Sequence, residues 1–400
     1  MTEAILDISR LISRVRYSTP SGVDRVEMAY ARGLLARYGD ALAFAAVHPS
    51  GVYGRIGRKA ALAYLDELER RWSSEADRPR QRSLASVMPQ LAALLPTTRG
   101  VGSATGGSLV YVQASPHHLT SQAKVQRILA RERAKFLCLV HDLIPIEFPE
   151  YARPSGAALH RRRIATLAAA IARTGGAAIV NSAATGRALQ PWLAPGTPIH
   201  VALLGTEALP TVAPDPGDGR PYFVCLGTIE PRKNHLLLLH LWRHLAATLP
   251  RERVPRLVVI GRRGWENEQV VDMLERCPAL AGHVEELGGC PDARLSALLR
   301  GARALVLPSF AEGYGMPVAE ALSVGTPVIC SHLPALREVG GRVPDYLDPL
   351  DGPGWKAAVL DHAASGPCHA AQMARLPGWR GPTWAEHIAI VARAIAGLRG

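Results

Sequence analysis

Short, uninterrupted apolar runs separated by amphipathic stretches organise the first half of the chain. The runs Ala41–Val47, Leu109–Gln113, Phe136–Val140 and Ala177–Val180 are predicted strands, and Ile5–Ile12 is predicted as one more. A run without polar alternation is typical of a strand covered on both faces, as in a parallel sheet. The first half is therefore predicted to be a parallel sheet flanked by helices.

A change in composition marks the boundary between two domains. Gly205–Pro221, GTEALPTVAPDPGDGRP, is rich in proline, glycine and aspartate and has no period, which is typical of a linker. Strands and helices alternate again after it, which predicts a second doubly wound domain. Its expected strands are Tyr222–Leu226, Leu257–Ile260, Val284–Leu287, Ala304–Leu307 and Pro327–Cys330, and its expected helices are Asn234–Leu249, Asn267–Cys277, Asp292–Arg300 and Val318–Ser323.

The end of the chain is predicted to be a loop-rich region followed by one helix. Asp345–Gly381 shows little regular pattern, whereas Trp384–Leu398 places apolar residues on one side of an amphipathic helix. The predicted domains are residues 1–210 and 211–383, with residues 384–400 forming a terminal helix that packs back on the first domain.

Length and composition agree with this division. A chain of 400 residues that is 48% hydrophobic exceeds one compact core and usually forms two domains. Its six cysteines stand singly, without the spacings of a zinc site, which indicates reduced thiols in a cytoplasmic protein. The N-terminus lacks the apolar core of a signal peptide, and no stretch approaches the roughly 20 apolar residues of a membrane span.

The net charge of +12 is concentrated in the first half. Residues 1–200 contain 26 Lys and Arg against 14 Asp and Glu, whereas residues 201–400 contain 20 of each. A basic surface attracts nucleic acid, anionic lipid or phosphorylated substrates, and a merely solubilising surface is the alternative. No helix-turn-helix, zinc-finger or RNP-like pattern accompanies the charge, so nucleic acid is not expected as a partner.

The richest chemistry follows the predicted strand that ends at Leu307. The sequence PSFAEGYGMPVAEALSVG places Glu312 and two glycines, Gly313 and Gly315, before a helix that carries Glu320. Glycines and a helix start offer backbone amides to an anion, and carboxylates suit hydroxyl groups. A nucleotide sugar carries both kinds of group, although an acidic pair that stabilises the helix start is the alternative.

This block resembles the signature of the family-4, or group 1, retaining glycosyltransferases. The resemblance rests on Glu312-x7-Glu320 within EGYGMPVAEALSVGTPVI and implies the GT-B fold, two facing Rossmann-like α/β domains. It implies that Glu312 approaches hydroxyls of the donor sugar and that Glu320 binds the ribose. It also implies that the amides of Gly313, Tyr314 and Gly315 lie near the diphosphate.

Two further stretches of the second half resemble the same family. In FVCLGTIEPRKNH, Gly227 follows a strand and the resemblance implies that Lys233 contacts the diphosphate. Thr228 stands where the family usually has an arginine, so Arg232 is expected to supply that charge. In LVVIGRRGWENE the resemblance makes Arg262 a candidate near the base and ribose. Arg263 and Trp265 are candidates there too, and packing is the alternative for Trp265.

Two stretches of the first half complete the expected site. VHDLIP resembles the family segment whose histidine faces the donor sugar, which makes His141 a candidate, with Asp142 either orienting its ring or capping the next loop. STPSGVDRVEMAY resembles the glycine loop near the donor phosphate and implies a role for Gly22. Asp24 and Arg25 either face the acceptor or fold that loop. An ordinary satisfied histidine and an ordinary turn are the alternatives.

The resemblance implies a hexosyltransferase that uses GDP-mannose or a UDP-sugar and needs no metal or other cofactor. The expected acceptor is a glycan or lipid-linked oligosaccharide in surface-polysaccharide assembly, at the inner face of the plasma membrane, with acceptor specificity in residues 52–107. The alternatives are a nucleotide-sugar epimerase of GT-B fold and a non-catalytic subunit that binds sugar nucleotide or membrane. A dinucleotide-binding role for Gly100–Gly107 is not expected, because that stretch precedes a strand.

Overall fold

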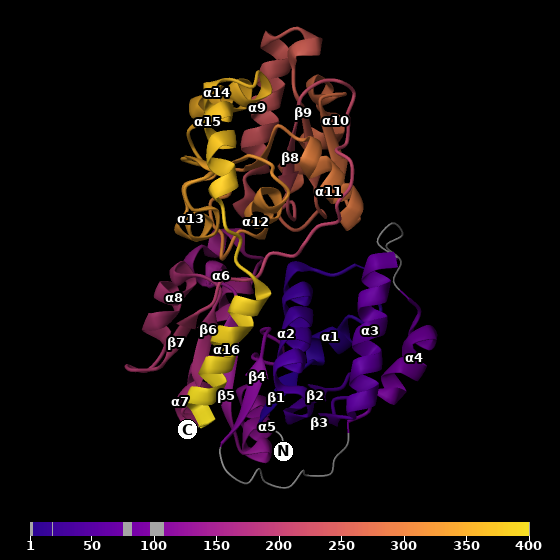
Figure 1. Cartoon of the computed structure of the whole chain (residues 1–400), viewed down its shortest axis with the longest axis vertical. Coiled ribbons are helices and arrows are strands. Elements are labelled where there is room, and N and C mark those ends of the chain that lie inside the picture. Colours follow the sequence, from indigo (N-terminus) through magenta and orange to yellow (C-terminus); the bar gives the residue numbers. More distant parts are fainter. Residues whose placement is uncertain (1–2, 18, 75–81, 97–107, 400) are drawn as a thin grey trace. The chain divides into compact units, whose positions relative to one another are not determined.

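The protein consists of two compact units, each with its own sheet of mainly parallel strands (Figure 1). The computed structural model describes residues 3–17, 19–74, 82–96 and 108–399. Unit 1 comprises Met1–Glu147, Pro154–Gly205 and Pro382–Gly400, and unit 2 comprises Phe148–Arg153 and Thr206–Gly381. The stretch 100–107 and part of the region 52–107, where acceptor specificity is expected, lie outside the described residues.

The sheet of unit 1 has seven strands in the order β3-β2-β1-β4-β5-β6-β7. All neighbours are parallel except β2 and β3. The order reverses beside β1, which is the mark of a doubly wound sheet. The strands are β1 (Ala4–Asp7), β2 (Leu42–Val47), β3 (Tyr53–Ile56), β4 (Leu109–Gln113), β5 (Ala134–Val140), β6 (Ala177–Val180) and β7 (Ile199–Val201).

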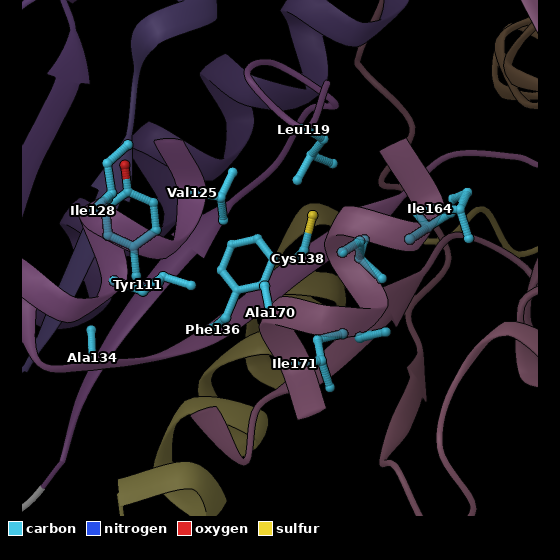
Figure 2. Close-up of a cluster of buried hydrophobic side chains, with 14 of the residues drawn as sticks. Tyr111, Leu119, Val125, Ile128, Ala134, Phe136, Cys138, Ile164, Ala170 and Ile171 are labelled. Carbon is cyan, nitrogen blue, oxygen red and sulfur yellow. The ribbon is translucent and has the colours of Figure 1, made fainter. Parts of the chain in front are cut away.

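Helices cover this sheet and close its core. They are α1 (Ser9–Ser13), α2 (Gly22–Tyr38), α3 (Arg58–Ser74), α4 (Leu84–Ala93), α5 (Gln122–Glu132), α6 (Ile144–Glu147), α7 (Gly156–Thr174), α8 (Ala183–Leu189) and α16 (Trp384–Arg399). Figure 2 shows one buried cluster, in which Phe136 and Cys138 of β5 lie against Ala170 and Ile171 of α7. The apolar residues of β5 are buried because helices cover its sheet.

The prediction of one strand over Ile5–Ile12 is wrong beyond Asp7. The carboxylate of Asp7 accepts a hydrogen bond of 2.7 Å from the backbone N–H of Ser9, which turns the chain into α1. Such a local bond from an aspartate competes with strand pairing. The apolar residues after Asp7 are buried as a helix face, so their burial alone did not distinguish helix from strand.

The sheet of unit 2 is fully parallel, with the order β10-β9-β8-β11-β12-β13. The predicted strands are confirmed to within one residue at either end. Their observed bounds are β8 (Tyr222–Leu226), β9 (Arg256–Ile260), β10 (Val284–Leu287), β11 (Ala304–Leu307) and β12 (Val328–Ser331), and β13 (Asp345–Leu347) completes the sheet.

The helices of unit 2 extend further along the chain than the sequence predicted. They are α9 (His235–Thr248), α10 (Glu268–Arg276), α11 (Asp292–Gly301), α12 (Met316–Ser323), α13 (Pro334–Gly340), α14 (Gly352–Ala363) and α15 (Pro367–Arg375). The prediction of a loop-rich region over Asp345–Gly381 is therefore wrong. Prolines stand in the first turns of α14 and α15, where they are compatible with a helix, and they obscured the pattern.

The C-terminal helix α16 is part of unit 1, where it packs against α2 and against strands β4 to β7 (Figure 1). A Cβ atom on Gly33 of α2 would lie 2.5 Å from Ile388, so the absent side chain lets the two helices approach closely. Over the described part of the chain, no helix is both long and apolar enough to cross a membrane.

Candidate functional site

The turn after β8 brings two loops of unit 2 into close contact. Gly227 has φ +144°, a conformation that glycine adopts readily, and its backbone N–H donates to Ile260 O at 2.9 Å. A Cβ on Gly261 would lie 1.9 Å from Gly227 O, so only glycine fits there. A Cβ on Gly227 would lie 3.2 Å from Cε of Lys233, which shows that the lysine side chain lies along this turn.

Lys233, Arg232 and Glu312 form one ion-paired cluster. Lys233 Nζ lies 2.5 Å from Glu312 Oε1, and Arg232 Nη1 lies 2.8 Å from Glu312 Oε2. The Oγ of Ser309 also donates to Glu312 Oε1, at 2.7 Å. The Lys233 and Glu312 side chains are each only 6% exposed. Three residues that the sequence proposed as catalytic are therefore in direct contact, although about 80 residues of chain separate the cations from the acid.

The cations fix the charge of Glu312. Burial by itself raises the pKa of this carboxyl, but Lys233 and Arg232 outweigh burial and lower the pKa to about 2. Arg232 also pairs through Nε with Glu230 Oε1 at 2.6 Å, and burial raises the pKa of Glu230. An ionised Glu312 thus holds both cations in place at neutral pH.

The cations lie at the entry to α9, in the turn before the helix. Pro231–Lys233 forms a single 3₁₀ turn, and Asn234 with φ +54° separates it from α9. The backbone carbonyl of Arg232 accepts the N–H of Phe310 at 2.8 Å, and Arg232 Nη1 also donates to Ala311 O. These bonds join the turn to the loop that carries Glu312.

The glycine-rich loop leads directly into α12. Gly315 caps this helix with φ +115°, and a Cβ there would lie 2.5 Å from Leu336. The first amides of a helix have no partner within it, which makes its start suitable for an anion. Tyr314 is buried and Gly313 is half-buried, while Glu320 is half-buried in the second turn. The loop therefore has the backbone form that the sequence predicted, and its ligand contacts stay a prediction.

The loop after β9 carries the candidates Arg262, Arg263 and Trp265. The side chain of Arg262 is exposed, and its carbonyl accepts the N–H of Ile229 at 2.9 Å. Arg263 is paired with Glu286 and Glu275. Trp265 Nε1 donates to Tyr151 O at 3.0 Å, which supports the packing interpretation of this tryptophan.

His141 lies in unit 1, at the carboxyl end of β5. Its Nε2 lies 2.9 Å from Ala114 O, so in the neutral ring Nε2 carries the hydrogen and Nδ1 is the acceptor. Burial lowers the pKa of His141, which favours that neutral ring. The backbone is fixed by Asn181, whose Nδ2 donates to His141 O at 2.8 Å. Asp142 Oδ1 accepts the N–H of Ile144, so Asp142 caps the next helix.

Gly22 is the first residue of α2. Ser21 caps the helix and forms a reciprocal capping box with Asp24, whose side chain is fully buried. Arg10 Nε donates to Asp24 at 2.7 Å and Nη2 donates to Ser21 Oγ at 3.1 Å. Asp24 thus folds the loop, one of the two roles that the sequence left open, and Gly22 stays a predicted phosphate contact.

Sequence reasoning missed Glu230, Ser309 and Arg10. The first two are buried polar residues that hold Arg232 and Glu312, and Arg10 holds the start of α2. A weak signal existed, since Glu230 and Ser309 each follow an apolar strand by a few residues. Within the described residues, no group of three or more His, Cys, Asp or Glu side chains is arranged to hold a metal ion.

Comparison with known proteins relates part of the chain to one family of glycosyl transferases. Residues 213–341 match the family described as Glycosyl transferases group 1. The O-antigen chain mannosyltransferase B of Escherichia coli is 40% identical over 139 residues, which are 35% of this chain and 36% of that protein. The serotype-specific mannosyltransferase WbdA of Escherichia coli is 27% identical over 250 residues, 56% of this chain and 29% of that protein. The chain thus spans about a third of the length of these relatives.

A likeness to solved structures extends over the whole chain. Anabaena Alr3699/HepE, solved in complex with UDP, has a TM-score of 0.60 and 15% identity, and the match covers 100% of both chains. The predicted GT-B fold class is confirmed, and so is the resemblance to group 1, mannosyltransferase-like glycosyltransferases. The matched segment 213–341 contains Gly227, Arg232, Lys233, Arg262, Glu312 and Glu320.

Proposed function

We propose that this protein is a retaining glycosyltransferase that transfers a hexose from a nucleoside-diphosphate sugar to a hydroxyl group of a glycan or lipid-linked oligosaccharide. The observation that carries the proposal is the buried cluster of Lys233, Arg232 and Glu312. This cluster combines cations for a diphosphate with a carboxylate for sugar hydroxyls. It lies within the segment that matches group 1 glycosyl transferases.

The cations provide the chemistry of the leaving group. Negative charge builds on the diphosphate as the bond to the sugar breaks, and fixed cations and helix-start amides stabilise that charge without reorganising. In this proposal Lys233 and Arg232 perform this role, supported by the amides of Gly313, Tyr314 and Gly315. Gly227 lets the turn approach the diphosphate closely.

The carboxylates orient the sugar nucleotide. An ionised carboxylate has about four acceptor sites, and described groups fill three of those on Glu312. We assign the remaining site to a hydroxyl of the donor sugar. Glu320 and Arg262 are assigned to the ribose and base, and Gly22 to the donor phosphate.

His141 is assigned to the sugar side of the reaction. Its neutral ring donates to Ala114 O and leaves Nδ1 as an acceptor for a sugar hydroxyl. Attack on the face from which the diphosphate leaves, with a donor phosphate oxygen taking the acceptor's proton, retains the anomeric configuration. That step requires no covalent protein nucleophile, and the ion pairs of Glu312 make it a poor one.

Mannose from GDP-mannose is the first candidate sugar, and UDP-sugars are the second. The first choice follows from the two Escherichia coli mannosyltransferases, and the second from the relative solved with UDP. We place the reaction in surface-polysaccharide assembly at the inner face of the plasma membrane, where the basic first half would contact anionic lipid. Flotation with anionic liposomes at low and high salt tests that contact, because salt screens charge attraction.

Transfer assays with a matched variant test the proposal. Wild-type protein is incubated with GDP-mannose or UDP-glucose, with and without a glycan acceptor, and product configuration is read by NMR. Lys233→Met should reduce transfer at least 100-fold. Arg276→Gln, which removes an exposed cation from the same unit, should leave transfer unchanged. Donor consumption without any acceptor would indicate an epimerase, and donor binding without turnover would indicate a non-catalytic subunit; either overturns the proposal.

A further inference from the structure

Four basic side chains gather at the carboxyl edge of the unit 1 sheet, outside the group 1 segment. Arg10 follows β1, His117 follows β4, Lys124 lies in the first turn of α5, and Arg163 lies on α7. The imidazole of His117 interacts electrostatically with the carboxylate of Asp7 and with the other three basic side chains. We call these four residues the basic cluster. Ligands of parallel sheets gather at this edge.

Arg163 is half-buried without a counter-charge. It lies one turn after His160, whose ring nitrogen Nε2 lies 3.1 Å from Asp142 O, so this face of α7 is turned toward the end of β5. Its Nε is buried and has no hydrogen-bond partner among the described residues, and no described carboxylate pairs with the side chain. Burial lowers the pKa of Arg163, and the charge of Arg10 lowers it further. A buried donor without a partner destabilises the fold unless a ligand supplies the missing acceptor.

The loop that carries His117 is strained and fixed. His118 has φ +64°, which is uncommon for a residue other than glycine, and its buried Nε2 also lacks a described partner. The two imidazole rings meet edge to face at 4.2 Å. Gln113 Nε2 donates to the carbonyls of Ser115 and His117 and holds the loop. Strain that the surroundings enforce is typical of ligand sites.

Among the described residues, the nearby carboxylates pair with Arg10 but with neither Lys124 nor Arg163. Asp24 accepts hydrogen bonds or ion pairs from Arg10 and from Arg14. Asp7 accepts the N–H of Ser9 and the hydroxyl of Tyr111. Lys124 and Arg163 therefore keep a net positive charge at this edge.

We propose that Arg10, His117, Lys124 and Arg163 bind a phosphoryl group of a phosphate ester or diphosphate. An arginine fork, a lysine and imidazole N–H groups match the oxygens of such an anion. The existence of this site does not depend on the proposed function. The assignment of this site to a substrate does depend on the proposed function. The phosphoryl group then belongs either to the donor or to a phosphorylated acceptor.

Calorimetric titration with inorganic pyrophosphate tests the site itself. Wild-type protein should bind two equivalents, one in each unit. Arg163→Gln should abolish binding of the equivalent in unit 1, and Lys233→Met should abolish binding of the equivalent in unit 2. The double variant should bind neither. The exposed neighbour Arg162→Gln is the matched control and should bind two equivalents. Undiminished binding to Arg163→Gln, or a single equivalent that only Lys233→Met removes, would overturn the proposal.

Thermal unfolding separates a ligand site from a structural role. Arg163→Gln should melt at or above the wild-type temperature without pyrophosphate, because it removes an unpaired buried cation, and it should lose stabilisation by pyrophosphate. A lower melting temperature with unchanged stabilisation by pyrophosphate would show that Arg163 has a structural role and would overturn the proposal. Lys124→Gln is the second variant and should weaken the unit 1 equivalent about tenfold.

Two measurements, of nucleotide affinity and of KM for a phosphorylated acceptor, distinguish the source of the phosphoryl group. If the affinity for GDP or UDP falls about tenfold in Arg163→Gln, the group belongs to the donor. If these affinities are unchanged while KM for a phosphorylated acceptor rises about tenfold, it belongs to the acceptor. If no donor supports transfer, the proposed function fails, while the pyrophosphate titrations still decide the site.

Discussion

At the scale of single residues, the site of unit 2 depends on charges that are buried together. Lys233 and Glu312 are both almost inaccessible, so each is stable there only because the other is present. Removing one partner of a buried ion pair costs about 3–5 kcal/mol, since the remaining charge is left unpaired. The residues proposed to bind the donor therefore also stabilise the unit that holds it.

Glu312→Gln should lower the stability of unit 2 by about 3 kcal/mol at pH 7. Because the folded pKa of about 2 lies below the ordinary value near 4.5, ionised Glu312 stabilises the fold above pH 4.5. This contribution is lost as the pH falls from 4.5 through 2. Thermal unfolding at pH 7 and pH 3 measures the effect, with the exposed Glu268→Gln as control. A difference that does not shrink at pH 3 would contradict the assignment.

Glu27→Gln should have the opposite pH dependence. This α2 carboxyl is 3% exposed, and burial raises its pKa to about 8. The folded protein keeps a proton that the unfolded chain releases above pH 4.5, so stability falls as the pH rises from 4.5 to 8. The variant should be more stable than wild type by roughly 2–4 kcal/mol at pH 8 and equal at pH 4. Chemical denaturation measures this, with exposed Glu150→Gln as control.

At the scale of elements, glycines let the loops of unit 2 pack closely. The N–H of Gly227 donates to Ile260 O and joins the ends of β8 and β9. Gly261 lies so close to Gly227 that there is no room for a side chain on Gly261. The turn that carries Lys233 begins there. The position of the lysine thus depends on a contact that contains no charge at all.

Gly261→Ala should displace this turn. The added methyl would meet the backbone oxygen of Gly227 at 1.9 Å, so one loop must move. We expect a loss of about 2 kcal/mol in stability and at least a tenfold loss of donor affinity. Gly288→Ala, at the end of neighbouring β10 with open space around it, is the control and should change neither. Donor titration and thermal unfolding check both, and unchanged affinity in Gly261→Ala would refute the coupling.

At the scale of the whole molecule, the last helix completes the first unit. Side chains of α16 such as Val391 and Ile395 are fully buried against unit 1, although its first strand lies almost 400 residues earlier in the chain. His387 is hydrogen-bonded through Nδ1 to Leu203 O and through Nε2 to the hydroxyl of Tyr30. Unit 1 therefore cannot complete its core until the end of the chain is present.

Ile395→Ala should destabilise unit 1 by about 3 kcal/mol, because it leaves a cavity at a fully buried position. The exposed neighbour Ala396→Ser should change stability by less than about 0.5 kcal/mol. Differential scanning calorimetry measures both. A stop codon at Trp384 should lower the first unfolding transition more than Ile395→Ala does, and a truncated chain that melts like wild type would contradict this role of α16.

The sequence by itself determined most of the strands and the glycine-rich loops, although it did not predict β3, β7 or β13. Strands buried on both faces must be apolar throughout, and glycine is needed where φ is positive, as at Gly227 and Gly315. Both are local requirements, so they are visible in a short stretch of sequence. Where a local pattern was ambiguous, as in Ile5–Ile12 and Asp345–Gly381, the prediction failed.

Only the tertiary structure decided which distant residues meet. The bonds of Glu312 to Lys233 and Arg232 and the burial of Arg163 without a carboxylate join segments far apart in the chain. A sequence pattern records how a residue relates to its neighbours along the chain. The energy of a buried charge depends instead on what the fold places beside it, and that is set by the order of strands in the sheet.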